Sequence, residues 1–167
     1  MRTLHFSPSS CSRQPQSGSA RTALAEHVGH LLPRGIAQEA ANMDWNGFTS
    51  TFAPEGAIRL GSWATEPAAR DQIDCRATLS IDNRILSLHA KASGPIGAMT
   101  SMLHDIGAPI QIVSLHQRTS GDQVITFLLC ENDDRQCWAA GFGASSDEAS
   151  INALIAGANR LLPAAPL

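Results

Sequence analysis

Beyond residue 54, short runs of alternating apolar and polar residues precede segments with a helical spacing. The clearest run is residues 75–81, in which every second side chain is apolar and the intervening positions hold Arg, Thr or Ser. A run at residues 57–63 precedes it, and another at residues 85–90 follows an Asp82-Asn83 turn. Strict alternation bounded by turn residues is typical of half-buried strands. The pattern therefore predicts three strands joined by turns.

The periodicity changes at Gly94-Pro95. Apolar side chains then fall three or four residues apart, at Ile96, Met99, Met102 and Leu103. Proline suits the first position of a helix, where a missing N–H costs nothing, and Gly107 favours a helix end. These features predict a helix that begins at Pro95 and closes a first βββα unit.

The same order of elements recurs in the second half of the chain. Three further strands are predicted at residues 110–115, 124–130 and 136–142, with an Asn-Asp-Asp turn before the last. A helix follows over about residues 146–162; Ser145 or Ser146 can cap it, and Glu148 stands where a capping box requires it. Two βββα units, each with a helix that needs a sheet to cover, predict an α+β layered domain.

The chain before these units has a different character. Residues 1–30 are rich in Ser, Pro, Gln and Gly and have no acidic residue until Glu26. Such a composition predicts a disordered head that becomes weakly helical from Thr22, where apolar residues first recur at helical spacings. An Arg- and Ser-rich, acid-poor segment is also typical of a transit peptide, so a tail and a targeting segment both remain open.

Composition excludes several classes of function. The chain has 167 residues, 43% of them apolar, and a net charge of −3 with the basic residues scattered. Nucleic acid and membrane are therefore not expected as partners, and no apolar run reaches the roughly 18 residues of a bilayer span. The four cysteines show no CxxC spacing, and the histidines show no HxH or HExxH spacing. We expect a cytoplasmic protein with no metal and no cofactor.

Four segments of the two units together resemble one part of a known enzyme. They are Cys75-Arg76-Ala77-Thr78-Leu79-Ser80-Ile81, the Leu88 to Ala98 stretch with its Ser-Gly-Pro turn, Trp138-Ala139-Ala140-Gly141-Phe142-Gly143, and Ala158-Asn159-Arg160-Leu161-Leu162. This pattern is similar to the C-terminal regulatory, or dimerisation, domain of α-isopropylmalate synthase, where leucine feeds back on its own synthesis. The resemblance assigns residues 55–163 to that domain and residues 31–54 to a shortened remnant of the subdomain that connects it to the catalytic barrel. A (β/α)₈ barrel needs about 200 residues, so we expect a stand-alone chain without synthase activity.

The resemblance implies a ligand site at the predicted helix start. In the family this loop forms part of the leucine pocket, which places Ser93, Gly94, Ile96 and Gly97 in that role. A helix start of this kind also suits a carboxylate, because its N–H groups are unpaired and its dipole end is positive. The family usually has Asn at the position of Ser93, so a side-chain amide contact is lost or shortened here. The plainer interpretation is that Gly94-Pro95 only begins a helix.

The family closes its pocket with a strand that ends in an acidic and aromatic cluster. Here the matching positions read Ser114-Leu115-His116-Gln117, without a carboxylate, and the chain has no tyrosine. A wall of Ile96, Ile112, Leu115 and Phe142 could still hold a branched side chain. These apolar residues can equally be core between sheet and helix.

Two functions follow from the resemblance. The first is a regulatory module that binds leucine or a related branched-chain acid and pairs with itself or with a separate isopropylmalate synthase subunit. The alternative is an interaction protein that keeps the fold and the dimer surface without binding the ligand.

Overall fold

The computed structural model describes Glu26 and residues 28–162, and it has the predicted α+β architecture. The first unit comprises β1 (Ile58–Pro67), β2 (Ile73–Ile81), β3 (Arg84–Ala92) and α4 (Pro95–Asp105). The second unit comprises β4 (Gln111–Ser120), β5 (Gln123–Asn132), β6 (Arg135–Gly143) and α5 (Ser146–Leu161). Each unit folds its strands into an antiparallel sheet in chain order, so the prediction of two βββα units is confirmed.

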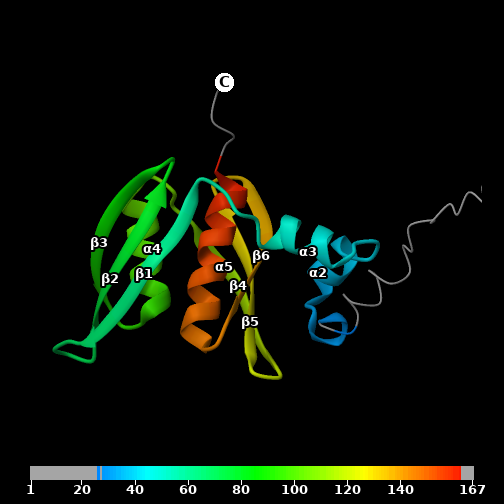
Figure 1. Cartoon of the computed structure of the whole chain (residues 1–167), viewed down its shortest axis with the longest axis horizontal. Helices are drawn as coiled ribbons and strands as arrows, with labels where there is room; N and C mark the ends of the chain where they lie inside the picture. Colours follow the sequence, from blue (N-terminus) through cyan, green and yellow to red (C-terminus); the bar gives the residue numbers. More distant parts are fainter. Residues whose placement is uncertain (1–25, 27, 163–167) are drawn as a thin grey trace, which may run out of the picture.

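The two helices of these units lie between the two sheets (Figure 1). Helix α4 packs on the first sheet, α5 packs on the second, and the helices contact each other. Their facing surfaces enclose one apolar core, to which both sheets contribute, as Leu79 does from the first and Leu128 from the second. Each sheet is covered on one face by the helix layer, which explains the alternation seen along its strands.

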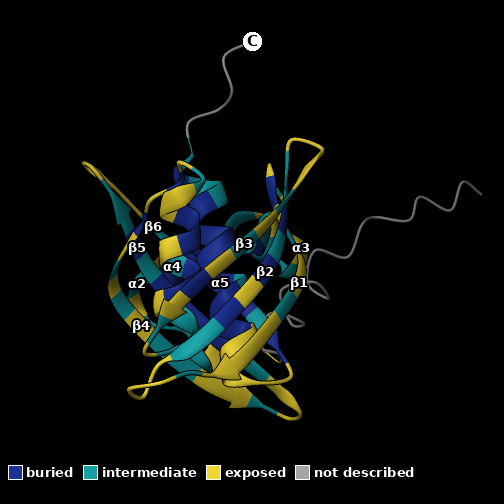
Figure 2. Cartoon of the chain, turned by 90° about the vertical axis from the view of Figure 1, so that its left-hand side faces the viewer, coloured by how far each residue is buried: buried dark blue, intermediate teal, exposed yellow. Residues whose placement is uncertain are grey.

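Residues 75–81 show this alternation as predicted. Cys75, Ala77 and Leu79 are buried against the helix layer, whereas Arg76 between them is exposed. Figure 2 views this sheet from outside and shows exposed and covered residues alternating along its strands. The outer face of the first sheet therefore carries mainly polar side chains.

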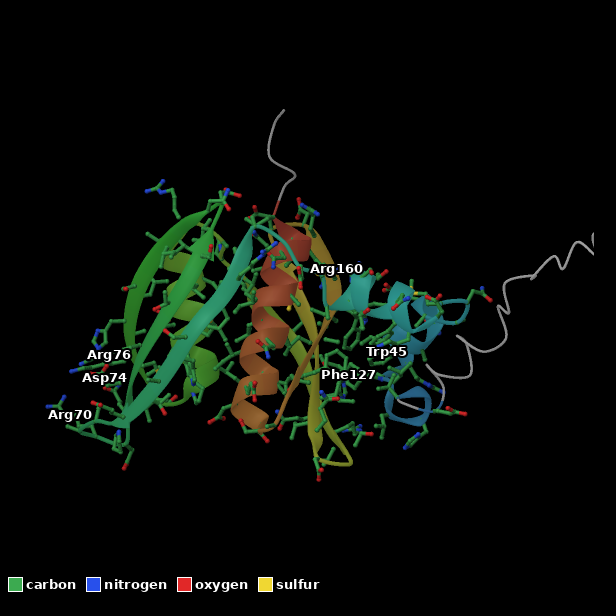
Figure 3. The ribbon with its side chains drawn as sticks, viewed as in Figure 1. Trp45, Arg70, Asp74, Arg76, Phe127 and Arg160 are labelled. Atoms are coloured by element: carbon green, nitrogen blue, oxygen red, sulfur yellow. The ribbon has the colours of Figure 1, made fainter. Side chains whose placement is uncertain are left out.

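The outer face of the second sheet is covered by the connecting segment, residues 31–54. Helix α2 (Arg34–Glu39) packs Ile36 on this face, and α3 (Trp45–Phe52) packs its aromatic residues there, so that together they form a second apolar core. Figure 3 shows Trp45 and Phe127 in the layer between α3 and the sheet. The Asp44 carboxylate caps α3 by accepting a hydrogen bond of 2.7 Å from the Gly47 N–H.

The hairpin turns have the backbone that their residues predict. Asp82 and Asn83 have φ of 46° and 68°, which matches a type I′ turn between β2 and β3. The strands β1 and β4 extend to Pro67 and Ser120, well past the predicted residues 63 and 115. The β1 extension is exposed and the β4 extension is polar and partly exposed, so hydrogen bonding along the ladder forms them without any apolar signal in the sequence.

Helix α5 begins with the predicted capping box. The Ser145 Oγ accepts from the Glu148 N–H at 3.2 Å, and the Glu148 carboxylate accepts from the Ala144 N–H at 2.8 Å. The weak helix predicted from Thr22 lies mostly outside the described residues; at Gly29–Leu31 the chain forms a 3₁₀ turn instead. Pro33 precedes α2 directly, since a proline φ is compatible with a helix entry. None of the described helices combines the length and apolar character needed to cross a bilayer.

Candidate ligand-binding site

The start of α4 presents backbone N–H groups that no side chain satisfies. Gly94 precedes the helix in an extended conformation, and the first helical bond runs from the Ala98 N–H to the Gly94 carbonyl at 3.1 Å. The N–H groups of Ile96 and Gly97 therefore have no acceptor within the helix. No side chain caps this end, in contrast to the start of α5. The result is a positive helix end suited to a carboxylate.

Open space lies in front of this helix end. A Cβ added at Gly94 would meet no atom within 4 Å, and the Gly94 φ of −170° is accessible to any residue. Ser93 is exposed beside it. The fold itself therefore does not require glycine at position 94, and the space remains available to a molecule that approaches the backbone.

Three of the predicted wall residues, Ile96, Ile112 and Leu115, lie on the side of α4 or of β4 that faces the apolar core between the two sheets. Ile96 and Ile112 are partly buried against the central core. Leu115 pairs with Leu128, a residue of that core, yet its own side chain is 39% exposed. A register shift between Ile112 and Ser114 places both Ile112 and Leu115 on the side of β4 that faces the helix layer. Ile112 and Leu115 thus share one side of β4, and Ile96 borders the same core from α4.

Phe142 does not border that core. It pairs with Ile125 on the opposite face of the second sheet, and its ring meets the Trp45 ring edge-on at 5.7 Å. The reason lies in its neighbour, because a Cβ at Gly141 would stand 2.2 Å from the Ala149 carbonyl oxygen. Only glycine lets α5 approach β6 there, so Phe142 must point to the other side. The predicted wall is corrected accordingly: within one chain, Phe142 is separated from Ile112 and Leu115.

The polar residues of β4 are engaged within the chain. Ser114 and His116 hydrogen-bond to each other at 3.0 Å on the face that carries Trp138. On the opposite face the Gln117 amide donates to Thr126 Oγ1 at 3.0 Å and to Ser150 Oγ and the Ser146 carbonyl at 3.1 Å. Gln117 therefore links the edge strand β4 to α5 by hydrogen bonds, and these bonds occupy its amide nitrogen.

The three cysteines among the described residues, Cys75, Cys130 and Cys137, are protonated thiols at neutral pH. Burial raises the pKa of Cys130 to about 12 and also raises the pKa of Cys75 and of Cys137. All three are free cysteines. Within Glu26 and residues 28–162, no three His, Cys, Asp or Glu side chains gather as metal ligands.

A cavity that the sequence did not indicate lies between the two units. It has a volume of about 430 Å³ and is lined by residues of β1, β6, α5 and the segment before β1. Its polar residues, among them Asn152 and Arg59, form no sequence motif. The one sequence feature that could have drawn attention to this cavity is Asn152, because asparagine is uncommon in the interior of a helix, where its side chain competes for backbone hydrogen bonds.

The fold is an α+β domain of two βββα units, and no side chain caps the start of α4. No family model matches the chain. The chain is 24% identical over 136 residues to a protein from Renibacterium salmoninarum named 2-isopropylmalate synthase, and the match covers 74% of this chain. The predicted resemblance is therefore confirmed. The chain spans about a quarter of the curated relative's length, since 23% of that protein is matched.

Proposed function

We propose that this chain is a regulatory module of the 2-isopropylmalate synthase type that binds leucine or a related branched-chain acid. The observation that carries the proposal is the uncapped start of α4, with open space before Gly94, in a chain similar to such a synthase. The proposal links the protein to leucine biosynthesis as a regulator, and it places the protein in the cytoplasm, where its free cysteines stay reduced.

The ligand carboxylate would accept hydrogen bonds from the N–H groups of Ile96 and Gly97. Both groups point out of the helix end, where the dipole adds to the attraction. The branched side chain would lie on Ile96, Ile112 and Leu115, and its burial contributes roughly 2 to 3 kcal/mol. The ammonium group would be matched by backbone carbonyls, because the polar side chains of β4 are engaged elsewhere.

A second copy of the chain is the proposed partner at this surface. Strand β4 is an edge of its sheet, and it exposes Val113 by 51% and Leu115 by 39%. An edge strand with exposed apolar side chains is a template for another chain unless it is covered. Pairing of two copies at β4 would cover it and would bring a second apolar surface to the ligand. A separate isopropylmalate synthase subunit is the alternative protein partner that could pair with this edge.

Calorimetric titration with leucine, isoleucine and valine tests the proposal. Gly94→Val places a bulky side chain in front of the Ile96 and Gly97 N–H groups, in space that the fold leaves empty. We expect the wild-type chain to bind and this variant to lose binding at an unchanged melting temperature. Absence of heat and of any thermal shift with all three amino acids at millimolar concentration would overturn the proposal.

One observation favours an alternative function. The residues that replace the family's acidic and aromatic cluster make hydrogen bonds within the chain, as Gln117 does with Thr126 and Ser150. A chain that uses this strand for its own stability could keep the dimer surface without the ligand. A dimer that binds none of the three amino acids would establish this interaction module in place of the sensor.

A further inference from the structure

The edge strands β1 and β6 face each other across α5 without hydrogen bonding. The two sheets are separate, so β1 is bonded only to β2 and β6 only to β5. Helix α5 contacts both edge strands and forms the floor between them. Residues Ala53, Pro54 and Glu55, just after α3, close the upper side. The space that remains is the cavity of about 430 Å³, which we name the junction cavity.

The junction cavity exists because several of the residues around it have small side chains. Gly141 is required because α5 lies against its backbone, and Ala140 and Ala156 are the small residues beside it. Larger aliphatic residues, Ile58 and Ile155, supply apolar sides. A volume of this size is within the range of about 300–1,000 Å³ that small-molecule sites occupy.

Backbone groups of both edge strands turn away from their own sheets, toward the same space. The N–H and carbonyl of Ile58 both turn away from β2, toward Asn159. Because backbone groups alternate along a strand, those of Leu60 turn to the same side and face the cavity. On the other edge, the Phe142 carbonyl accepts from the Asn152 side chain at 2.8 Å, so the groups of Ala140 point inward as well. The cavity therefore offers hydrogen-bond donors and acceptors above an apolar floor.

One cation stands at the mouth of the junction cavity. The Arg59 guanidinium lies 3.9 Å from the Glu55 carboxylate, and the two side chains are 67% and 89% exposed. That distance exceeds a hydrogen bond, and an exposed pair of this kind contributes little. Arg59 can therefore turn to a carboxylate in the cavity, which it would hold with two parallel hydrogen bonds.

We propose that the junction cavity binds a small aliphatic carboxylic acid. The hydrocarbon part lies against Ile58, Leu60 and Ile155, and the carboxylate meets Arg59 and the Leu60 N–H. Such a ligand touches both sheets, α5 and the end of the connecting segment, so it fastens the connecting helices to the two units. None of the residues that line this cavity belongs to the α4 start, and the proposal does not rest on the function proposed for that start.

Amide chemical shifts separate the two sites in one titration. The probes are leucine, 4-methylpentanoate, which keeps the carboxylate without the ammonium, and 3-methylbutylamine, which lacks the carboxylate. We expect 4-methylpentanoate to shift the amides of Leu60, Ala140 and Asn152, and 3-methylbutylamine to shift none of them. Shifts confined to residues 94–97 would overturn the junction site while supporting the proposed function. Equal shifts with the amine would overturn the role of the carboxylate.

Two variants and a control complete the test. Ala156→Leu fills the cavity from α5 and should abolish the shifts at Leu60. Arg59→Gln should weaken 4-methylpentanoate binding about tenfold, the effect of one charge-assisted hydrogen bond. Because this side chain is exposed, the variant keeps the packed interior unchanged and tests the site even if Ala156→Leu does not fold. Arg84→Gln removes an exposed arginine on β3, at the opposite edge of the first sheet from β1, and should leave binding unchanged. Unchanged binding in Arg59→Gln, or an equal loss in Arg84→Gln, would overturn the assignment.

Discussion

Asn159 on α5 satisfies both backbone groups of Ile58 at the start of β1. Its Oδ1 accepts from the Ile58 N–H at 3.0 Å, and its Nδ2 donates to the Ile58 carbonyl at 2.9 Å. The last helix thus holds the first strand as a neighbouring strand would. Gly56 permits this approach, because a Cβ there would stand 2.6 Å from the Asn159 Cγ. One side chain therefore joins the two βββα units.

Replacement of Asn159 tests this link. Asn159→Ala removes two hydrogen bonds from partly buried groups, and we expect the free energy of unfolding to fall by about 1 to 3 kcal/mol. Urea denaturation measures the change. Asn46→Ala, at an exposed position on α3, is the matched control and should change stability by less than about 0.5 kcal/mol. Equal effects of the two replacements would show that the contact between Asn159 and Ile58 does not contribute to the free energy of unfolding.

Two glycines provide a paired prediction about packing. Gly141→Ala drives a methyl group against the Ala149 carbonyl and the Ala153 N–H, both 2.2 Å away, so α5 must shift. Overpacking against backbone of this kind should cost about 3 kcal/mol. Gly94→Ala enters open space in an extended conformation and should leave the melting temperature unchanged. A large loss of stability in Gly94→Ala would mean that the α4 start is constrained by the fold and would remove it as a clean probe of ligand binding.

Light scattering tests the proposed dimer. We expect a mass of twice the chain mass of 17.7 kDa at micromolar concentration. Leu115→Lys places a charge on the exposed edge of β4 and should shift the mass toward the monomer. Ile85→Lys is the control, because Ile85 is 74% exposed but lies on the outer face of the first sheet. Dissociation by Ile85→Lys alone would move the interface to that sheet.

The strands of the first sheet were predictable because each has one covered face, whereas β5 in the second sheet is covered on both faces. Residues 75–81 show this well, since the helix layer imposes a period of two on their side chains. The direction of Phe142 was not predictable from that pattern. Trp138, Ala140 and Phe142 alternate with small residues, and nothing in the sequence says which face α5 takes. The close approach of α5 to Gly141 determines which face of β6 the helix covers. This is a tertiary contact that a local sequence pattern does not contain.

The junction cavity escaped prediction for a related reason. It is formed between two edge strands from different units, and its residues come from two stretches far apart in the chain, 53–60 and 140–159. The α4 start was accessible to sequence reasoning because its features, Gly94, Pro95 and the missing cap, are consecutive. Local chemistry predicts a helix end, whereas a gap between sheets follows only from the assembled fold.

The pKa shift of Cys130 predicts a loss of stability at alkaline pH. Burial raises the pKa of this thiol from 9.0 to about 12, so the unfolded chain loses its proton first. The contribution is fully present below pH 9 and is lost as the pH rises to about 12. Burial also raises the pKa of Cys75 and of Cys137, so these two thiols contribute to the same decline. Cys130→Ala should flatten the decline of melting temperature across this pH range, and an unchanged slope would contradict the assignment.

The last prediction concerns catalysis. The relative named 2-isopropylmalate synthase is matched over 23% of its length, and the described part of this chain forms two βββα units without a (β/α)₈ barrel. Barrel enzymes build their active sites from the eight loops at one end of the barrel, so the groups for acyl transfer have no scaffold in these units. We therefore expect the purified 167-residue chain to release no free CoA from acetyl-CoA and 2-oxoisovalerate with a divalent metal. Turnover that co-purifies with the chain and is lost in the Gly141→Ala variant would contradict this expectation. Turnover that is unaffected by that variant would point to a contaminating synthase instead.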